Sequence, residues 1–440
     1  MNVSKFFDLA KEKGIAQSQI QVGRSSSFNI SLFHHEVEKY KVSKSQSVVA
    51  CGIYNDKFGS GRTEKLGKDT FDFLTNQIIT SASFIEEESE KEIFPGSPKY
   101  HKKNVFNPGL AKVSAEEKLA LLFKIENLAY AADPRITDVP TVRYAESESE
   151  SEFYNSFGLK LKQKSNYFYI VLGVKAEQNG EIKTAYNIIL DSDLSKVDPE
   201  AFVKKAVDEA LAKFGGVQCV SGKYPTVLHS DIMADLLDYF LGSASSDEVQ
   251  RQSSFLIGKL GQKIASSKLT IEEKPLEKNI FFNYFDDEGV ATQNKAIVKN
   301  GVLKTYFYNL ETAKKDGVAS TGNGVWAGNK IGIGFSNIFV KPGKKSFEEM
   351  IAPIKEGVYI TEIAGLGTGM NAQSGDFSCQ ADGFMIRDGK IAEPLNLITL
   401  SGNLLKMLKD LKEFDSRVEL KTSATSIADA YIKSMSIGGK

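Results

Sequence analysis

Strand patterns and helix patterns occur in separate blocks along this chain. Polar and apolar residues alternate over several strand lengths in residues 19–62, and strand patterns return later with a hairpin signal at Asn179-Gly180. Further along, many short strand patterns are separated by glycine turns such as Asn300-Gly301. A doubly wound α/β fold would alternate strands with helices, so we predict an α+β fold with largely antiparallel and mixed sheets and flanking helices.

The length of 440 residues suits two domains of this kind. A helix is well marked in residues 198–216, with Asp198 as its N-cap and Gly215 just past its end. We interpret this helix as a bridge between an N-terminal α+β domain, residues 1–197, and a C-terminal domain, residues 217–440. The density of short strands in the C-terminal domain predicts a barrel- or sandwich-like arrangement.

Two helical stretches separate the strands of the predicted N-terminal domain. The first covers residues 68–94, and the second covers residues 114–132. The second opens with Ser114 and Glu117 in capping-box spacing, which is a signal for a helix start. We therefore expect helices on a sheet formed by the flanking strands.

Charge and cysteine content exclude several classes of protein. Lys and Arg number 55 against 56 Asp and Glu, so the chain offers no basic face for nucleic acid and no polybasic membrane anchor. No apolar run approaches the length of a membrane span. The three cysteines, Cys51, Cys219 and Cys379, are far apart and form neither a metal clip nor a disulfide framework. We expect a cytoplasmic protein without a nucleic-acid or membrane partner.

The stretch from His229 to Ser243 places one histidine and three aspartates close together. On a helix, Asp231, Asp235 and Asp238 share one face, and apolar residues gather on the opposite face. Zinc hydrolases typically use two histidines a turn apart with a glutamate beside them, whereas His229 stands alone before the helix. We interpret the three aspartates as a solvated acidic face.

The other histidines do not suggest a zinc site either. His34 and His35 are adjacent, so in the predicted strand they point to opposite faces. His101 lies among lysines and an asparagine, as in a solvated loop. We therefore predict no metal held by histidines in this chain.

A cluster of carboxylates, Asp286, Asp287 and Glu288, precedes Gly289. Paired carboxylates can perform acid–base chemistry, but adjacent residues on a strand diverge. An acidic turn between two strands is the simpler interpretation, and the acid–base site stays open as the alternative.

Two glycine-rich loops, residues 320–324 and 365–376, are candidate binding loops. Neither carries the GK[ST] ending of a P-loop, and neither opens a clear helix after a strand. Glycine permits close backbone approach, including approach by a bound peptide. We therefore predict substrate contacts from Ser320, Thr321, Gly322, Asn323, Gly365, Gly367, Gly369 and Asn371.

A series of motifs resembles the PmbA/TldD family, once called modulators of DNA gyrase and classed as peptidase U62. The order DDEGV, NG, STGN, SGDF, IRDGKI and LSGN runs through the C-terminal half, and residues 19–54 are similar to the N-terminal pattern of the family. The resemblance covers nearly the whole chain, and the order is more specific than any single motif.

This resemblance implies a role within a peptidase complex. TldD-type chains carry HExxxH on a helix and act as the zinc subunit, whereas TldE/PmbA-type chains lack that motif and pair with them to degrade unfolded or extended peptides. This sequence contains no HExxxH. The resemblance places Met233 and Asp238 at the positions of the two zinc histidines, and Ala234 at the position of the glutamate.

The resemblance thus implies a TldE/PmbA-type subunit that is not catalytic alone and has no metal or cofactor of its own. Zinc is expected in a TldD-like partner, and a homodimer is expected when that partner is absent. Two alternatives stay open. One is an autonomous hydrolase with a metal held by Asp231, Asp235, Asp238 or the 286–288 cluster, and the other is a peptide-binding scaffold without proteolysis.

Overall fold

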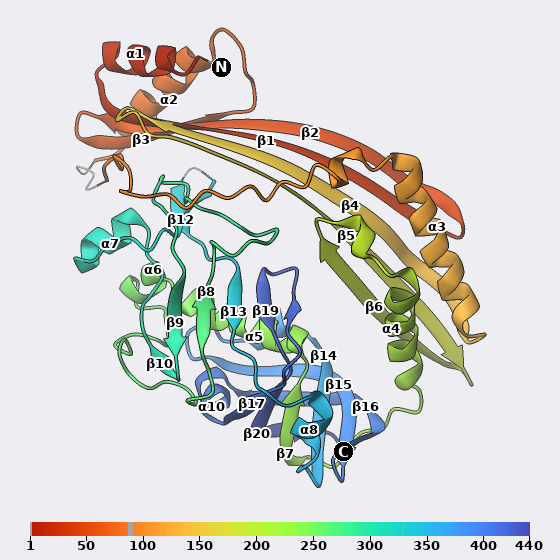
Figure 1. Ribbon diagram of the computed structural model, residues 1–440. Helices are drawn as coiled ribbons and strands as arrows, with labels where there is room; N and C mark the ends of the chain where they lie inside the picture. The colour runs from red at the N-terminus through yellow and green to blue at the C-terminus, as the bar shows by residue number, and fades with distance from the viewer. Residues whose placement is uncertain (1, 87–90, 329) are drawn as a thin grey trace.

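The computed structural model describes residues 2–86, 91–328 and 330–440, and it has the α+β fold that the sequence predicts. Figure 1 shows a long, curved N-terminal sheet that arches over the C-terminal half of the chain. We call it the arching sheet. Its strand order is β3-β2-β1-β4-β5-β6, and neighbouring strands are antiparallel. The strands are β1 (Ile15–Phe33), β2 (Glu36–Tyr54), β3 (Lys57–Thr63), β4 (Ile136–Asn155), β5 (Lys160–Gln178) and β6 (Glu181–Asp191).

Helices cover one face of the arching sheet at its two ends. One end carries α1 (Ser4–Glu12) and α2 (Thr70–Ser83), and the other carries α3 (Ala115–Ala132) and α4 (Pro199–Ala212) (Figure 1). Alternate residues of β1 face these helices, so Ile20 and Val22 belong to one core and Ile30 and Leu32 to the other. The opposite face of the sheet is left for the C-terminal half. Short 3-10 helices lie at Leu110–Lys112 and Leu194–Lys196.

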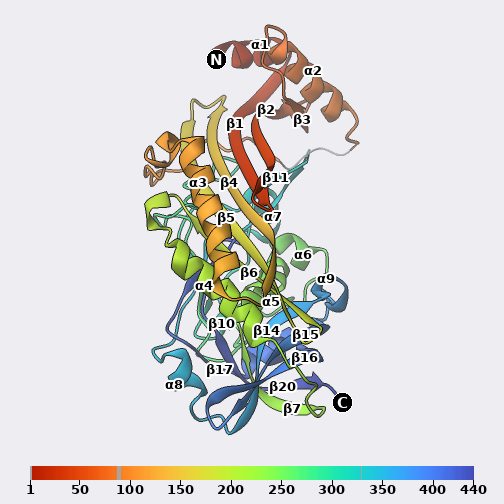
Figure 2. The same cartoon turned by 90° about the vertical axis from the view of Figure 1, so that its right-hand side faces the viewer.

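The C-terminal half contains a five-stranded barrel, as Figure 2 shows at the bottom of the molecule. The order β16-β15-β14-β7-β20 is closed into a ring by a further pairing of β16 with β20. Only β7 and β14 run parallel within it. Its strands are β7 (Gly222–Leu228), β14 (Glu356–Ala364), β15 (Asp376–Arg387), β16 (Lys390–Asn403) and β20 (Ala430–Gly438), with β17 (Leu411–Phe414) beside β20.

A second sheet packs with the barrel around one central helix. Its order is β10-β9-β8-β13-β19-β18. The helix α5 (Ser230–Ser243) contributes Met233, Leu236 and Leu237 to a core shared with both sheets. The strands of the second sheet are β8 (Ile271–Glu273), β9 (Lys295–Lys299), β10 (Val302–Leu303), β13 (Ile338–Val340), β18 (Glu419–Leu420) and β19 (Thr425–Ile427). The remaining elements are α6 (Ser246–Gln250), α7 (Leu310–Asp316), the hairpin β11 (Gly324–Ala327) and β12 (Lys330–Ile333), α8 (Phe347–Ile351), α9 (Leu366–Gly369) and α10 (Leu404–Lys409).

The helix predicted as a bridge packs on the arching sheet. Phe202, Val203 and Ala206 of α4 lie in the same core as strands β4 and β5. The predicted N-cap is confirmed, because Asp198 accepts a hydrogen bond from the backbone N–H of Ala201 at 3.1 Å. No helix within the described ranges is long and apolar enough to cross a membrane.

The prediction that His34 and His35 lie in a strand is wrong. They form the two-residue turn between β1 and β2, with φ of 50° and 61°. Positive φ at both central residues suits the twist of a tight hairpin. Their rings approach different carboxylates: Nε2 of His34 lies 3.1 Å from Asp138, and Nδ1 of His35 lies 3.3 Å from Glu126.

The helix expected over residues 68–94 is shorter than predicted, because α2 ends at Ser83. A longer helix would place the acidic run that starts at Glu86 in its C-terminal turns, where the helix dipole disfavours negative charge. Residues 87–90 lie outside the described residues, and residues 91–94 are neither helix nor strand. The capping box of Ser114 and Glu117 at the start of α3 is confirmed.

Candidate functional site

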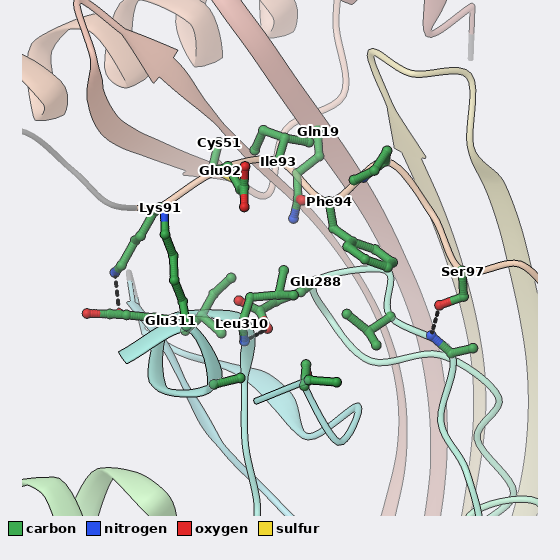
Figure 3. A pocket seen from close by; sticks show the side chains of 18 of the residues that line it. Gln19, Cys51, Lys91, Glu92, Ile93, Phe94, Ser97, Glu288, Leu310 and Glu311 are labelled. Atoms are coloured by element: carbon green, nitrogen blue, oxygen red, sulfur yellow. Dashed lines mark hydrogen bonds and ion pairs between the residues drawn. The ribbon is translucent and has the colours of Figure 1, made fainter. Parts of the chain in front are cut away.

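A pocket of about 700 Å³ lies where the arching sheet meets the C-terminal half. We call it the seam pocket. The arching sheet contributes Gln19, Cys51 and Phe58, and the segment 91–97 crosses one side. The C-terminal half contributes the acidic turn, α7 and the loop that ends at Ser320 (Figure 3). The pocket therefore depends on segments that are far apart in the sequence.

The walls of the seam pocket are largely apolar, with a few polar groups between them. Gln19 and Glu288 reach into it from opposite sides (Figure 3). At its edge, Lys91 and Glu311 form an ion pair at 3.0 Å. The apolar lining includes Phe58, Ile93, Phe94, Val290, Leu310 and Ile331. An apolar concavity with a few convergent polar groups is the usual form of a small-ligand site.

The acidic residues 286–289 form a turn, which confirms the simpler interpretation. The N–H of Gly289 donates to the carbonyl of Asp286 at 3.0 Å, and Gly289 has φ of 82°. This turn is not solvated, since Asp286 is 4 % exposed and Glu288 is 8 % exposed. Burial of two carboxylates within three residues is costly unless hydrogen bonds or protons compensate their charge.

Backbone hydrogen bonds stabilise the buried carboxylate of Asp286. Its carboxylate accepts hydrogen bonds from the N–H groups of Glu288, Val290 and Gly324 at 2.9 to 3.0 Å. Asp287 accepts from the side chain of Gln21 at 2.8 Å and, at the same distance, from the backbone of the β11–β12 hairpin. These bonds join the acidic turn to the arching sheet and to the hairpin.

Glu288 is less well compensated than Asp286. Its Oε2 accepts the N–H of Leu310 at 2.8 Å, and no donor among the described residues bonds to Oε1. Burial, followed by the neighbouring charge of Asp286, raises the pKa of Glu288 well above its usual range. Burial likewise raises the pKa of Asp286, in spite of its three backbone donors. Glu288 is therefore a carboxyl group with a raised pKa that faces the seam pocket.

The loop 320–323 divides between the seam pocket and the interior. Ser320 lines the seam pocket. Thr321 and Asn323 are buried, and Nδ2 of Asn323 donates to Oε1 of Glu273 at 2.9 Å. Glu273 in turn forms a buried ion pair with Lys295. The buried part of this loop thus holds the second sheet together.

The loop 365–371 lies elsewhere and contributes nothing to the seam pocket. Gly365 has φ of 78° and starts the single turn α9, where Gly367 has open space around it. A Cβ at Gly369 would lie 2.2 Å from the carbonyl oxygen of Ser378. The close approach at Gly369 is therefore made to β15 of the same chain. Asn371 is exposed and accepts hydrogen bonds from two backbone N–H groups of its own turn.

Two family models match most of this chain. The C-terminal domain of the PmbA/TldA metallopeptidases matches residues 221–439, and their central domain matches residues 108–214. The chain belongs to the PmbA/TldD family. It is 26 % identical over 446 residues to the metalloprotease PmbA of Escherichia coli O157:H7, covering 100 % of this chain and 95 % of that one.

Two solved structures superpose on nearly the whole chain. A Thermotoga maritima protein named for modulation of DNA gyrase is 29 % identical, with a TM-score of 0.92 and 99 % of each chain covered. TldE from Thermococcus kodakarensis has a TM-score of 0.93 at 23 % identity, with 99 % of this chain and 100 % of that chain covered. At 23 % identity, the likeness to TldE shows only that the two chains share a fold.

The residues of α5 do not fit the metal that the family description implies. Met233 and Ala234 are buried in the core, whereas Asp238 is exposed on another face of the helix. Asp231 is engaged by Lys421 at 2.8 Å and by His229 at 3.2 Å. In residues 2–86, 91–328 and 330–440, no three His, Cys, Asp or Glu side chains are grouped as metal ligands.

The acidic face of α5 is confirmed as exposed, and its members differ in charge behaviour. Burial opposes ionisation of Asp231, but His229 and Lys421 outweigh it and hold the pKa of Asp231 below its usual value. Partial burial, followed by the charges of Asp231 and Asp238, raises the pKa of Asp235. Partial burial also raises the pKa of Asp238. The negative charge of this face is offset in part by the contacts of Asp231 with His229 and Lys421.

Sequence reasoning identified the acidic turn but missed the pocket that Glu288 faces. Gln19 and the segment 91–97 gave no signal of a site in the sequence. Gly324 did give a signal in the sequence, because a glycine directly after STGN permits another segment of the chain to approach closely. Cys379 is buried in β15, on the same face of the strand as the buried Phe377.

Proposed function

We propose that this chain is a TldE/PmbA-type subunit that completes a peptide-binding chamber with a TldD-like, HExxxH-bearing zinc subunit. The observation that carries the proposal is α5, where Met233 and Ala234 are packed in the core and no histidine pair is present. A helix with these residues lacks the nitrogen ligands of a zinc peptidase. Hydrolysis then takes place at the zinc of the partner, and this chain contributes substrate binding.

An exposed strand edge supports binding of an extended peptide. β3 pairs only with residues 48–54 of β2, which leaves residues 36–47 of β2 without a described strand on that side. Unpaired backbone N–H and C=O groups of an edge strand can pair with an added strand, independent of its side chains. Main-chain recognition of this kind suits unfolded or extended substrates of varied sequence.

Association with a second chain is part of the same proposal. A subunit that faces a homologous partner retains an interface that a second copy of itself can cover with two-fold symmetry. We expect a homodimer in isolation and a heteromeric complex on co-expression with a TldD-like chain. Light scattering of each preparation measures this, and a monomer that also fails to co-purify with the partner would remove the interface from the proposal.

The deciding experiment is cleavage of a denatured polypeptide by this chain alone, by a TldD-like chain alone and by the reconstituted mixture. We expect turnover from the mixture and none from this chain, and elemental analysis should find no stoichiometric zinc in this chain after dialysis. Robust cleavage by the isolated chain, together with about one tightly held metal ion per chain, would favour the autonomous hydrolase. Peptide binding by the mixture without cleavage would favour the scaffold.

A further inference from the structure

We propose that the seam pocket binds an ammonium group carried on an apolar body, in the form of the N-terminus of a short apolar peptide, with Glu288 as its anionic partner. No part of the proposed peptidase role assigns a ligand to this pocket. The peptide identity of the ligand rests on that role, whereas the ammonium chemistry rests on the pocket alone.

One carboxylate oxygen of Glu288 has no donor among the described residues. Glu288 is more than nine-tenths buried, and among the described residues only the N–H of Leu310 donates to it. Its Oε1 therefore has no donor from that part of the chain, and the side chain extends into the pocket (Figure 3). A carboxylate oxygen that borders a pocket, on a side chain that is otherwise buried, is stabilised by a ligand that brings a donor to it.

The acidic residues at the inner wall of the pocket determine which charge a ligand can carry. Asp286 and Asp287 lie directly behind Glu288, and no described Lys or Arg forms an ion pair with any of these three carboxylates. At the edge, Lys91 is already paired with Glu311. The inner wall of the pocket is thus acidic, which favours a cation over an anion. The ligand is an organic cation, because no described group of three carboxylates, His or Cys is placed to hold a metal ion.

The apolar lining of the pocket suits a ligand with an apolar body. Phe58, Phe94, Val290 and Ile331 line the space around the carboxylate, and about 700 Å³ lies within the range that small organic ligands occupy. Gln19 adds a second polar group, because its Nε2 donates to the carbonyl of Asp287 and its amide oxygen is left as an acceptor. An ammonium group bound between Glu288 and Gln19 would have an apolar residue beside it.

An ammonium partner would change the protonation of Glu288. Burial raises the pKa of Glu288, and a bound cation would favour the ionised form and lower that pKa again. Below the pKa values of both the ligand-free carboxyl and the α-amino group, binding of the ammonium to the carboxylate must therefore release a proton. The charged and titratable groups that face Glu288 are Asp286 and Asp287 on its own turn, Cys51 on β2, Lys91 and Glu92 on the crossing segment, and Glu311 and Lys314 on α7.

The test is isothermal titration calorimetry on the intact chain without any partner. At about pH 8, Phe-Leu-amide should bind at least about tenfold more tightly than its N-acetyl derivative, which lacks the ammonium group. Affinity for Phe-Leu-amide should fall by up to about tenfold per unit as the pH is lowered below about 7, because Glu288 takes up a proton, and it should also fall above about pH 9, because the α-amino group loses its proton. Equal binding of the free and acetylated peptides would overturn the proposal.

Variants locate the effect. Glu288→Gln should abolish both the preference for the free N-terminus and the loss of affinity below about pH 7, whereas Glu277→Gln, at an exposed glutamate outside the pocket, should retain both. Val318→Trp, at the 49 % exposed rim, should weaken binding of both peptides by filling the entrance. Unchanged preference in Glu288→Gln, or unchanged binding in Val318→Trp, would show that the ligand binds elsewhere.

Hexylamine distinguishes a peptide from a simple amine. Weaker binding of hexylamine than of Phe-Leu-amide supports a peptide N-terminus, and tighter binding overturns that part of the proposal. Because these measurements use no partner and no cleavage, their failure leaves the proposed peptidase role untouched. A failed reconstitution of peptidase activity likewise leaves the ammonium site standing.

Discussion

The carboxylate of Glu288 occupies the space that a side chain at residue 324 would need. A Cβ built at Gly324 would lie 2.6 Å from Oε2 of Glu288, the same oxygen that accepts the N–H of Leu310. The N–H of Gly324 also donates to Asp286 at 2.9 Å. The glycine that ends the STGNG loop thus lets β11 pass directly against the acidic turn.

Gly324→Ala should therefore displace the Glu288 carboxylate and destabilise the fold by about 1–3 kcal/mol, through overpacking and a lost hydrogen bond. The measurement is the free energy of unfolding in denaturant. Gly332→Ala in the neighbouring strand is the matched control, since its nearest neighbour would lie at 3.7 Å. Equal stability of the two variants would contradict the close approach.

Stability should fall as the pH rises from about 5 to about 9, because of the acidic turn. Burial raises the pKa values of Asp286 and Glu288, so between the unfolded and folded pKa values the folded chain holds more protons than the unfolded chain. Their contribution is complete below the ordinary carboxyl pKa and is lost as the pH rises through the raised values. Glu288→Gln should lose about 1–3 kcal/mol less than wild type between about pH 5 and pH 9. Parallel pH profiles of the two proteins would argue against a raised pKa.

The acidic face of α5 should be dispensable for peptidase turnover. Asp235→Asn with Asp238→Asn removes like charges three and four residues apart, which should stabilise the helix by about 0.2–0.5 kcal/mol per pair. Turnover of a denatured peptide by the reconstituted mixture should stay within about twofold of wild type, since neither carboxylate is a ligand or a base in the proposed role. Cleavage by the isolated wild-type chain that disappears in this double variant would place the active site on α5.

Substitutions at Gly367 and Gly369 should distinguish an effect on stability from an effect on peptide capture. Gly369→Ala should destabilise the chain, because its Cβ would meet the carbonyl of Ser378. Gly367→Phe projects into open space, so its unfolding should match wild type. Weaker capture of an extended peptide by the Gly367→Phe complex would place this loop at the substrate. Unchanged capture would remove Gly367 from the binding surface.

Asn323 should matter for stability, whereas Asn371 should not. Asn323→Ala removes one donor from the buried Glu273, which keeps Lys295 and the N–H of Ser336, and removes the side-chain donor to the carbonyl of Gly334, at a cost of about 1–3 kcal/mol. Asn371→Ala removes bonds within an exposed turn, and we expect a loss below about 1 kcal/mol. Thermal unfolding of both variants checks the difference. A mild Asn323→Ala would mean that the loop is held by other contacts.

Local patterns explain which elements could be predicted from the sequence. The capping box of Ser114 and the N-cap Asp198 act within one turn of their own helices, so residue types alone reveal them. The acidic face of α5 follows equally from helical spacing. The turn of His34 and His35 was missed because Asn-Gly or Asp-Gly is the usual sequence of such a turn, and two histidines carry no such signal.

The candidate site required the tertiary structure. The acidic turn could be read from its sequence, but the burial of Glu288 depends on Gln19 and residues 91–97, which approach it from the other half of the chain. Likewise, the sequence shows that Asn323 follows a glycine, whereas only packing reveals its bond to Glu273 in another strand. Local periodicity carries no information on contacts of such long range.

The matched family domains do not coincide with the folded units of this chain, because β1 pairs with β4. Residues 108–214 match a family domain of their own, yet β4 within them pairs along residues 142–155 with residues 19–32 of β1. A fragment that starts at residue 108 would therefore expose a long row of unpaired backbone groups at the edge of β4. Such an edge recruits strands from other molecules, so the fragment would aggregate even though every residue of the matched domain is present.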